Sequence, residues 1–260
     1  MLRHITLPNA LTIQYEVIFR RRKTAEIRIQ PGGTVMITVP LHTSEAAITE
    51  LFVKKQRWIT ERLEAMKQRR EAMSTHQFMS GEPFLYLGQV LTLQVNIDPA
   101  HKRKKPYITF TADHLVNGQF IVTLGEEDPI AIRTALEQWY RKQTFDIVNE
   151  RIQHYQPLIQ RQPSHVQVKE QKRRWGSCSS AGKLMFNWRI SMAPLEILDY
   201  IVVHEMCHLI HMNHSHYFWQ LVESILPDYH QQNDWLKEQG WRLDLEQYFI
   251  IFRGSSSMIY

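Results

Sequence analysis

Hydrophobic and polar residues alternate along much of the first half of the chain, with the period of two that is typical of half-buried strands. The alternation predicts six strands, at residues 11–19, 25–30, 34–40, 83–97, 107–118 and 119–125. Pro31-Gly32-Gly33 and Asn117-Gly118 supply turn residues that favour hairpins between neighbouring strands. We therefore expect a β-rich N-terminal region.

A longer period, close to 3.6 residues, predicts helices elsewhere in the chain. It predicts five helices, at residues 44–70, 129–159, 194–211, 217–225 and 231–239. Thr43 or Ser44 supplies the N-cap of the first helix, and Pro129 and Pro194 stand in the first turns of the second and third. The helices therefore fall mainly in the second half of the chain.

The organisation of the chain changes near residue 126, with strands dominating before it and helices after it. Residues 166–190 predict two further strands around a turn of small residues from Gly176 to Gly182. No internal repeat is evident in the sequence. These patterns predict an α+β protein with a boundary near residue 126.

Composition narrows the class of protein. With 260 residues and 43% hydrophobic content, the chain can bury one large core or two smaller ones. The two cysteines, Cys178 and Cys207, are too few for a disulfide scaffold and indicate a reducing compartment. No segment approaches the roughly 18 apolar residues of a membrane helix. We therefore expect a soluble, cytoplasmic protein with no membrane partner.

The most informative stretch is YIVVHEMCHLIHMNHSHYFW, residues 200–219, in which five histidines and one glutamate interrupt an apolar run. Residues 204–208, HEMCH, match H-E-x-x-H. Positions four apart share one face of a helix, so His204 and His208 can bind the same metal ion. Glu205 can then take a proton from water that the metal activates. The alternative is a helix with solvated histidines on its polar face.

A catalytic zinc ion takes three protein ligands and a water molecule. His211 continues the helical stripe, but at about 1.5 Å rise per residue it lies roughly 10 Å along the axis from His204. Zinc–nitrogen bonds of about 2 Å cannot span that distance. The third ligand is therefore expected beyond the helix end, near Asn213, where the chain can turn back. His214 is the first candidate and His216 the second.

Two segments, RRWGSCSSAGKLMFNWRISMAP and YIVVHEMCHLIHMNHSHYFWQLV, closely resemble the YgjP-like metallopeptidase family. This family is related in motif to the SprT/Spartan and WLM groups of minimal zincins. The segments RRRKTAEIRIQPGGTVMITVP and KKQRWI resemble its amino-terminal region. The resemblance is most specific over residues 173–219. It implies His204, His208 and His214 as zinc ligands and Glu205 as general base.

The resemblance also implies an architecture and an activity. It implies an α+β fold, in which a minimal zincin-like metallopeptidase domain packs its HExxH helix against a small sheet. We expect a β-rich region with one helix at residues 1–126, the catalytic domain at 127–245 and a C-terminal tail at 246–260. The strand around residues 183–190 would be the sheet edge along which a peptide substrate lies. The expected activity is zinc-dependent hydrolysis of peptide bonds in a protein or peptide substrate.

Several residues near the motif are candidates for contacts with the substrate. The developing oxyanion needs an electrophile besides zinc. The candidates for that role are Arg173, Arg174, Tyr200 and Tyr217. Trp175 adjoins the two arginines, and Asn187 lies on the strand that precedes the metal helix. Asn187 and Trp188 can instead brace that helix.

The net charge leaves two alternatives to a peptidase. The chain carries a formal charge of +5, with basic clusters at residues 20–23, 102–105 and 169–174. Such clusters are either solvated loops or surfaces for polyanions, and Trp175 can add base stacking. One alternative is a metal-dependent hydrolase of nucleotide phosphoanhydrides. The other is a DNA-associated protein with a non-catalytic zinc site. Glu205 argues against this second alternative, because a structural zinc ion has no use for a carboxylate there and usually has four protein ligands.

Overall fold

The computed structural model describes residues 2–8, 12–29, 33–71, 73–101, 105–111, 118–171 and 174–249. The chain divides into two compact units, with the division between Met73 and Ser74. The boundary predicted near residue 126 lies inside the second unit, and the extent of the catalytic domain, residues 127–245, stays a prediction. Both units combine strands and helices, which confirms the α+β class.

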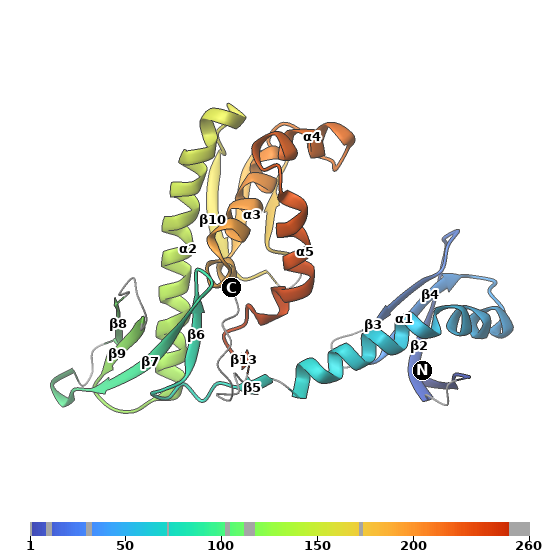
Figure 1. Ribbon diagram of the computed structural model, residues 1–260, viewed down its shortest axis with the longest axis horizontal. Coiled ribbons are helices and arrows are strands. Elements are labelled where there is room, and N and C mark those ends of the chain that lie inside the picture. The colour runs from blue at the N-terminus through green and yellow to red at the C-terminus, as the bar shows by residue number, and fades with distance from the viewer. Residues whose placement is uncertain are drawn as a thin grey trace. The chain divides into compact units, whose positions relative to one another are not determined.

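The first unit is a four-stranded sheet covered by one helix (Figure 1). Its strands are β1 (Leu2–Thr6), β2 (Thr12–Arg20), β3 (Glu26–Ile29) and β4 (Val35–Pro40), in the order β1-β2-β4-β3. The predicted hairpin between β3 and β4 is confirmed, whereas the alternation of residues does not predict β1. Helix α1 (Glu45–Glu71) buries Ile48, Phe52 and Ile59 against the sheet. The Ser44 hydroxyl accepts a hydrogen bond from the Ala47 amide at 3.3 Å, as an N-cap does.

The second unit contains a sheet with the same strand order. Its strands are β6 (Pro83–Tyr86), β7 (Gln89–Ile97), β8 (Tyr107–Thr111) and β9 (Gln119–Leu124), in the order β6-β7-β9-β8. The single strand predicted over residues 83–97 is wrong, because Leu87 and Gly88 form a tight turn with φ of 47° and 78°. Positive φ at both positions matches a two-residue hairpin turn. In the predicted Asn117-Gly118 turn, Asn117 lies outside the described residues.

The two four-stranded sheets are topological repeats of each other. In each sheet the two outer pairs are antiparallel and the middle pair, β2 with β4 or β7 with β9, is parallel. A long helix follows each sheet in the chain. The sequences of the two sheets share little beyond short similarities such as LTIQ at residues 11–14 and LTLQ at residues 91–94. The repetition is therefore one of topology, and the sequence alone does not indicate it.

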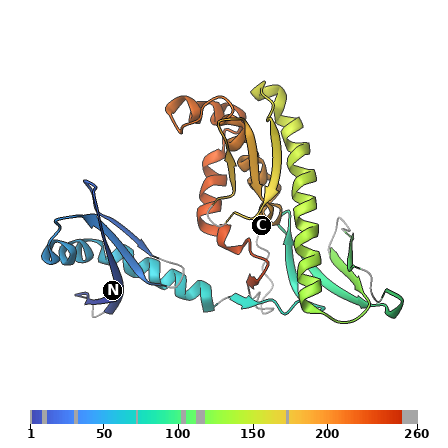
Figure 2. The same cartoon turned by 180° about the vertical axis from the view of Figure 1, so that it is seen from behind.

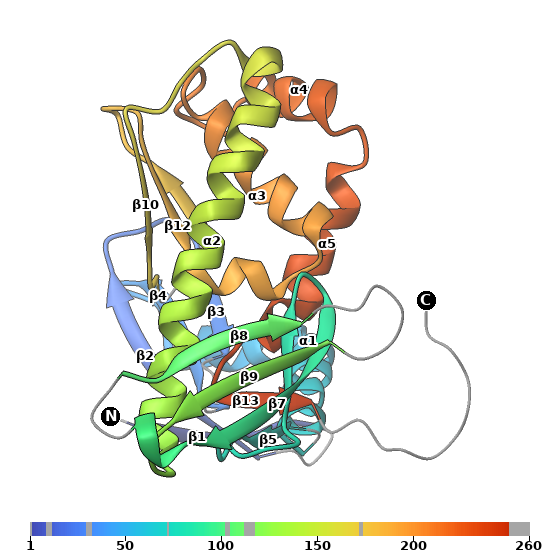
Figure 3. The same ribbon diagram turned by 90° about the vertical axis from the view of Figure 1, so that its left-hand side faces the viewer.

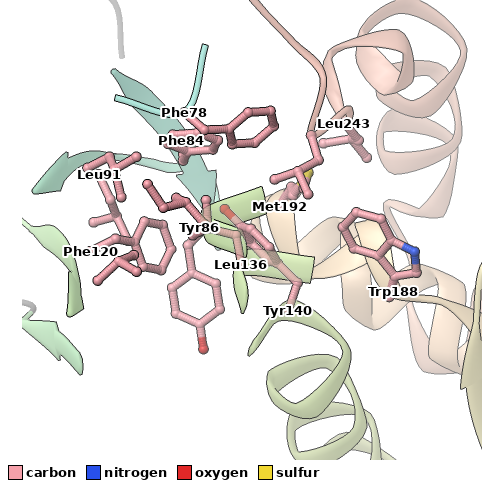
Figure 4. Packing of buried hydrophobic residues seen from close by; sticks show 14 of the residues in the cluster. Phe78, Phe84, Tyr86, Leu91, Phe120, Leu136, Tyr140, Trp188, Met192 and Leu243 are labelled. Atoms are coloured by element: carbon pink, nitrogen blue, oxygen red, sulfur yellow. The ribbon is translucent and has the colours of Figure 1, made fainter. Parts of the chain in front are cut away.

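Helix α2 (Pro129–Ile159) contributes buried side chains to both hydrophobic clusters of the second unit. Asp128 caps it by accepting hydrogen bonds from the amides of residues 130 and 131. Its first half packs on the sheet β6-β7-β9-β8, which crosses it in Figure 3. The Tyr140 ring lies 5.8 Å from the Phe120 ring and 6.0 Å from the Trp188 ring (Figure 4), and its hydroxyl donates to the Leu85 carbonyl at 2.6 Å. This packing joins the sheet to the segment that precedes the histidine motif.

A three-stranded sheet lies beside α2 (Figure 2). Its strands are β10 (His165–Lys169), β11 (Gly176–Cys178) and β12 (Lys183–Asn187), in the order β10-β12-β11. Two predictions are wrong here. The turn predicted from Gly176 to Gly182 contains a strand, β11. The strand predicted at the sheet edge, β12, is instead central, because β10 pairs with one side of it and β11 with the other. The edge that faces the histidine motif therefore belongs to β11.

Helices complete the second unit. They are the short 3-10 helices η1 (Pro99–His101), η2 (Trp188–Met192) and η3 (Gly240–Arg242), and the α-helices α3 (Leu195–Cys207), α4 (His216–Ile225) and α5 (Tyr229–Gln239). Strand β13 (Gln247–Phe249), within the predicted C-terminal tail, pairs with β5 (Met73–Thr75). Among the helices that the structure describes, none is long and apolar enough to cross a membrane.

Candidate active site

The histidine motif lies on α3, an apolar helix that is buried along most of its length. Asp199 on this helix is 8% exposed and accepts two hydrogen bonds from Arg151 of α2, at 2.6 and 2.9 Å. It accepts a third from the Tyr155 hydroxyl at 3.0 Å. A buried carboxylate needs such partners, so this cluster fixes α3 against α2. The helix ends at Cys207, earlier than the predicted end near His211.

Three histidines come together where α3 ends. One nitrogen of each of His204, His208 and His214 lies within 4.8 Å of the others. Nε2 of His204 and Nε2 of His214 are 3.1 Å apart. Two nitrogens bound to one tetrahedral ion at about 2.0–2.1 Å lie roughly 3.3 Å from each other. The arrangement is therefore close to what a shared metal ion requires, and it depends on the chain turning back between α3 and α4.

The surroundings of His204 and His208 favour the neutral imidazole, the form that binds metal. Burial, with the neighbouring His208 and His214, lowers the pKa of His204 to about 3, and burial also lowers the pKa of His208. Nδ1 of His208 donates to the carbonyl oxygen of His211 at 2.9 Å, which leaves Nε2 of His208 as the lone-pair donor. Within the described part of the chain, the buried Nδ1 of His204 has no hydrogen-bond partner. The donor set fits a metal ion that prefers nitrogen ligands.

Aromatic residues of α4 pack against the three histidines. The buried Phe218 ring lies 4.9, 4.5 and 4.9 Å from the rings of His204, His208 and His214. Trp219 stacks on His214 at 5.5 Å, and it stacks in turn on Tyr229 of α5 at 5.3 Å. Such packing limits the rotamers available to the imidazoles, so the three rings are held in place before any metal binds.

Glu205 lies under the edge strand β11. Its side chain is largely buried, and burial raises the pKa of Glu205 to about 8, against the opposing effect of Arg174. A Cβ atom at Gly176 would lie 2.6 Å from Cγ and 2.7 Å from Oε1 of Glu205. Only glycine leaves room for the carboxylate at this point of β11. The strand therefore fixes the position of Glu205 beside His204.

Two hollows of the second unit meet at Glu205, because Gly176, His204 and Glu205 line both of them. We call the first, of about 400 Å³, the metal hollow. Its other lining residues are Arg174, Ser177, Cys178, His208, Met212 and His214. We call the second, of about 370 Å³, the apolar hollow. Its other lining residues are Trp175, Tyr200, Ile201, Asn233, Leu236 and Lys237.

The remaining predicted site residues are distributed differently. Arg173 lies outside the described residues. Arg174 lines the metal hollow, and Trp175 lines the apolar hollow. Asn187 is buried and lines neither hollow, and its side-chain amide donates to the carbonyls of residues 171 and 174. Tyr217 is 68% exposed, stacks on His211 with ring centroids 6.4 Å apart and lines neither hollow.

Several residues that line these hollows were not predicted from the sequence, among them Gly176 and three residues of α5. Gly176 was assigned to a turn, but a glycine within a strand also often marks a place where another group lies very close to the backbone. The other three, Asn233, Leu236 and Lys237, lie on α5 and share one face because they are three and four positions apart. Nothing in the sequence indicates which element this face meets.

The family model described as the YgjP-like metallopeptidase domain matches residues 23–239. The match covers well over half of the chain, so the protein belongs to the YgjP-like metallopeptidase family, and membership implies a bound metal ion and a peptide substrate. No curated protein matches the sequence. A crystal structure of the metallopeptidase zymogen of Pyrococcus abyssi abylysin shares 21% sequence identity, over 36% of this chain and 95% of that chain, with a TM-score of 0.33.

Proposed function

We propose that the protein is a zinc-dependent peptidase in which His204, His208 and His214 hold the metal and Glu205 is the general base. The observation that supports this most directly is the convergence of three imidazoles with Glu205 beside them. Three nitrogen ligands with an open side are typical of catalytic zinc. A structural site usually has four protein ligands, and among the described residues no fourth histidine, cysteine or carboxylate joins the group.

The chemistry divides between the metal and the residues around it. When bound, zinc supplies Lewis acidity that polarises water and the substrate carbonyl. Glu205 accepts the proton of the attacking water at its carboxylate and delivers it to the leaving amine. Gly176 keeps that carboxylate next to His204. Arg174, which lines the metal hollow, is the best-placed candidate to stabilise the developing oxyanion.

The unpaired side of β11 is the place where we expect the substrate backbone to lie. Among the described strands, β11 pairs only with β12, so its other edge can bind an extended peptide through main-chain hydrogen bonds. Gly176 at the start of this strand lines both hollows. A peptide on this edge therefore passes directly over Glu205.

The proposal is tested by metal removal. Purified protein is incubated with casein and, separately, with nucleoside triphosphates, before and after treatment with a chelator. We expect casein to be cleaved, the cleavage to fall to background after chelation, and added zinc to restore it, because the site loses its Lewis acid reversibly. Triphosphate hydrolysis without casein cleavage would contradict the peptidase assignment and favour phosphoanhydride chemistry at the same site.

A second candidate function, binding of nucleic acid by the first unit, is supported by the distribution of charge. Residues 1–73 contain 13 of the 31 basic residues but seven of the 26 acidic ones, whereas the rest of the chain has 18 basic and 19 acidic residues. The whole positive excess therefore belongs to the first unit. On α1, Trp58 is 45% exposed, and Lys55 and Arg62 lie three and four positions away on the same face. An exposed indole between cations suits base stacking with phosphate contacts.

Charge reversal on α1 tests this second function. We expect the Lys55→Glu, Arg62→Glu double variant to bind a fluorescent single-stranded oligonucleotide about 10-fold more weakly than wild type, with a shallower salt dependence, because phosphate contacts are lost. The matched control is Lys142→Glu with Arg161→Glu, two exposed residues of the second unit. Equal loss in the control, or binding insensitive to salt, would contradict a site on the first unit.

A further inference from the structure

The apolar hollow has no role in the chemistry described so far, although it adjoins the reacting groups. Three elements form its walls: residues 175 and 176 at the start of β11, residues 200–205 of α3, and residues 233–237 of α5. Trp175, Tyr200, Ile201 and Leu236 supply most of the lining as apolar or aromatic surface. At about 370 Å³ the hollow is at the lower end of the size range of small-molecule pockets. It therefore has room for one large side chain.

The walls of the apolar hollow are fixed before any ligand enters. The carbonyl of Trp175 accepts a hydrogen bond from the backbone N–H of Asn187 at 2.8 Å. The Trp175 ring lies so close to Gly240 that a Cβ there would be 3.1 Å from it. On the opposite wall, Tyr200 stacks on Tyr229 with ring centroids 6.4 Å apart. A preformed pocket of this kind binds with little loss of conformational entropy.

The charges around the apolar hollow disfavour an acidic occupant. Among its lining residues the only lysine or arginine is Lys237, and its ammonium group is already paired with Asp234 at 2.6 Å. Glu205 contributes a carboxyl group on the wall shared with the metal hollow, which repels an acidic ligand when ionised. An uncharged, bulky side chain gains most by leaving water here, because each buried apolar Å² contributes about 25 cal/mol.

We propose that the apolar hollow binds a bulky apolar side chain, such as Phe or Leu, on a substrate residue adjacent to the scissile bond. This inference rests on the proposed peptidase function. The position follows from the shared wall: Gly176, His204 and Glu205 line both hollows, so a carbonyl held over Glu205 places the neighbouring side chain at the mouth of the apolar hollow. The hollow then selects which peptide bond is cleaved.

The test compares cleavage of peptides that differ only in one flanking residue, Phe or Ala. We expect wild type to prefer the Phe peptide by at least about 10-fold in kcat/KM, within the range that pocket contacts supply. Leu236→Trp fills the hollow and should remove most of that preference, whereas Leu236→Ala should retain Phe and admit Trp. The matched control is Leu158→Trp on α2, an exposed leucine outside both hollows. Wild type without this preference, or a preference unchanged in Leu236→Trp, would overturn the assignment.

A binding measurement separates failure of the pocket from failure of the peptidase function. Saturation-transfer NMR with N-acetyl-phenylalaninamide and N-acetyl-alaninamide needs no turnover. If wild type cleaves no peptide, the peptidase proposal fails, and the hollow is judged by this binding alone. Binding of the Phe probe that Leu236→Trp abolishes supports an apolar side-chain site. No difference between the two probes overturns it.

Discussion

Replacing Glu205 by glutamine is expected to lower kcat/KM for peptide substrates by about 10³-fold, in the middle of the range that general bases contribute. Glutamine has nearly the same shape, so it fits the space that Gly176 leaves beneath β11. It cannot accept the proton of the attacking water. The three histidines do not depend on Glu205 for their positions, because Phe218 and Trp219 pack against them from α4. Metal content should therefore stay at the wild-type level.

The decisive comparison pairs the activity and the metal content of each variant. Glu196→Gln is the matched control, since this glutamate lies in the exposed first turn of the same helix. We expect it to keep both wild-type activity and wild-type metal. Loss of metal in Glu205→Gln would show that the carboxylate helps to hold the ion. Retained activity would place the general base elsewhere in the metal hollow.

The sequence predicted the helices better than the strands, for a physical reason. Helix α2 is specified locally, because Asp128 caps its first turn and its apolar residues recur with one period. Strand β11 is specified by its partner, since it pairs with β12 across a short turn. Its residues, Gly-Ser-Cys, have low strand propensity. The alternation of residues therefore predicted a turn where backbone pairing makes a strand.

The repeated sheet topology was likewise not predictable from the sequence. The parallel pairing of β2 with β4 and of β7 with β9 is a property of the sheets, and alternation alone does not distinguish parallel from antiparallel neighbours. What the sequence does contain is short, namely LTIQ against LTLQ, with a basic loop following in each copy. These similarities gain meaning only once the strand order is known.

The metal residues were accessible from sequence because helical spacing and helix length constrain them. Residues four apart on a helix must share a face, and one ion cannot span His204 and His211, so a ligand beyond the helix had to be sought. The walls of the apolar hollow had no such constraint. Leu236 and Lys237 meet Tyr200 only because α5 packs beside α3, and no local pattern specifies that contact.

Replacing His214 by alanine is expected to remove most of the metal. Two imidazoles remain, and nothing among the described residues replaces the nitrogen 3.1 Å from His204. Deleting a mere hydrogen-bond partner of a ligand costs up to about 100-fold in affinity, so loss of a ligand itself should cost at least that much. Elemental analysis of purified protein measures the result directly. Zinc-dependent activity should fall together with the metal.

The matched control for this variant is His216→Ala, two residues further along. His216 is exposed in the first turn of α4, and its ring is not part of the group of three. We expect it to retain about one metal per chain, because the three ligands that hold a catalytic zinc are intact. The reverse outcome, with metal kept in His214→Ala and lost in His216→Ala, would move the third ligand onto α4. The packing of Trp219 on His214 would then need another explanation.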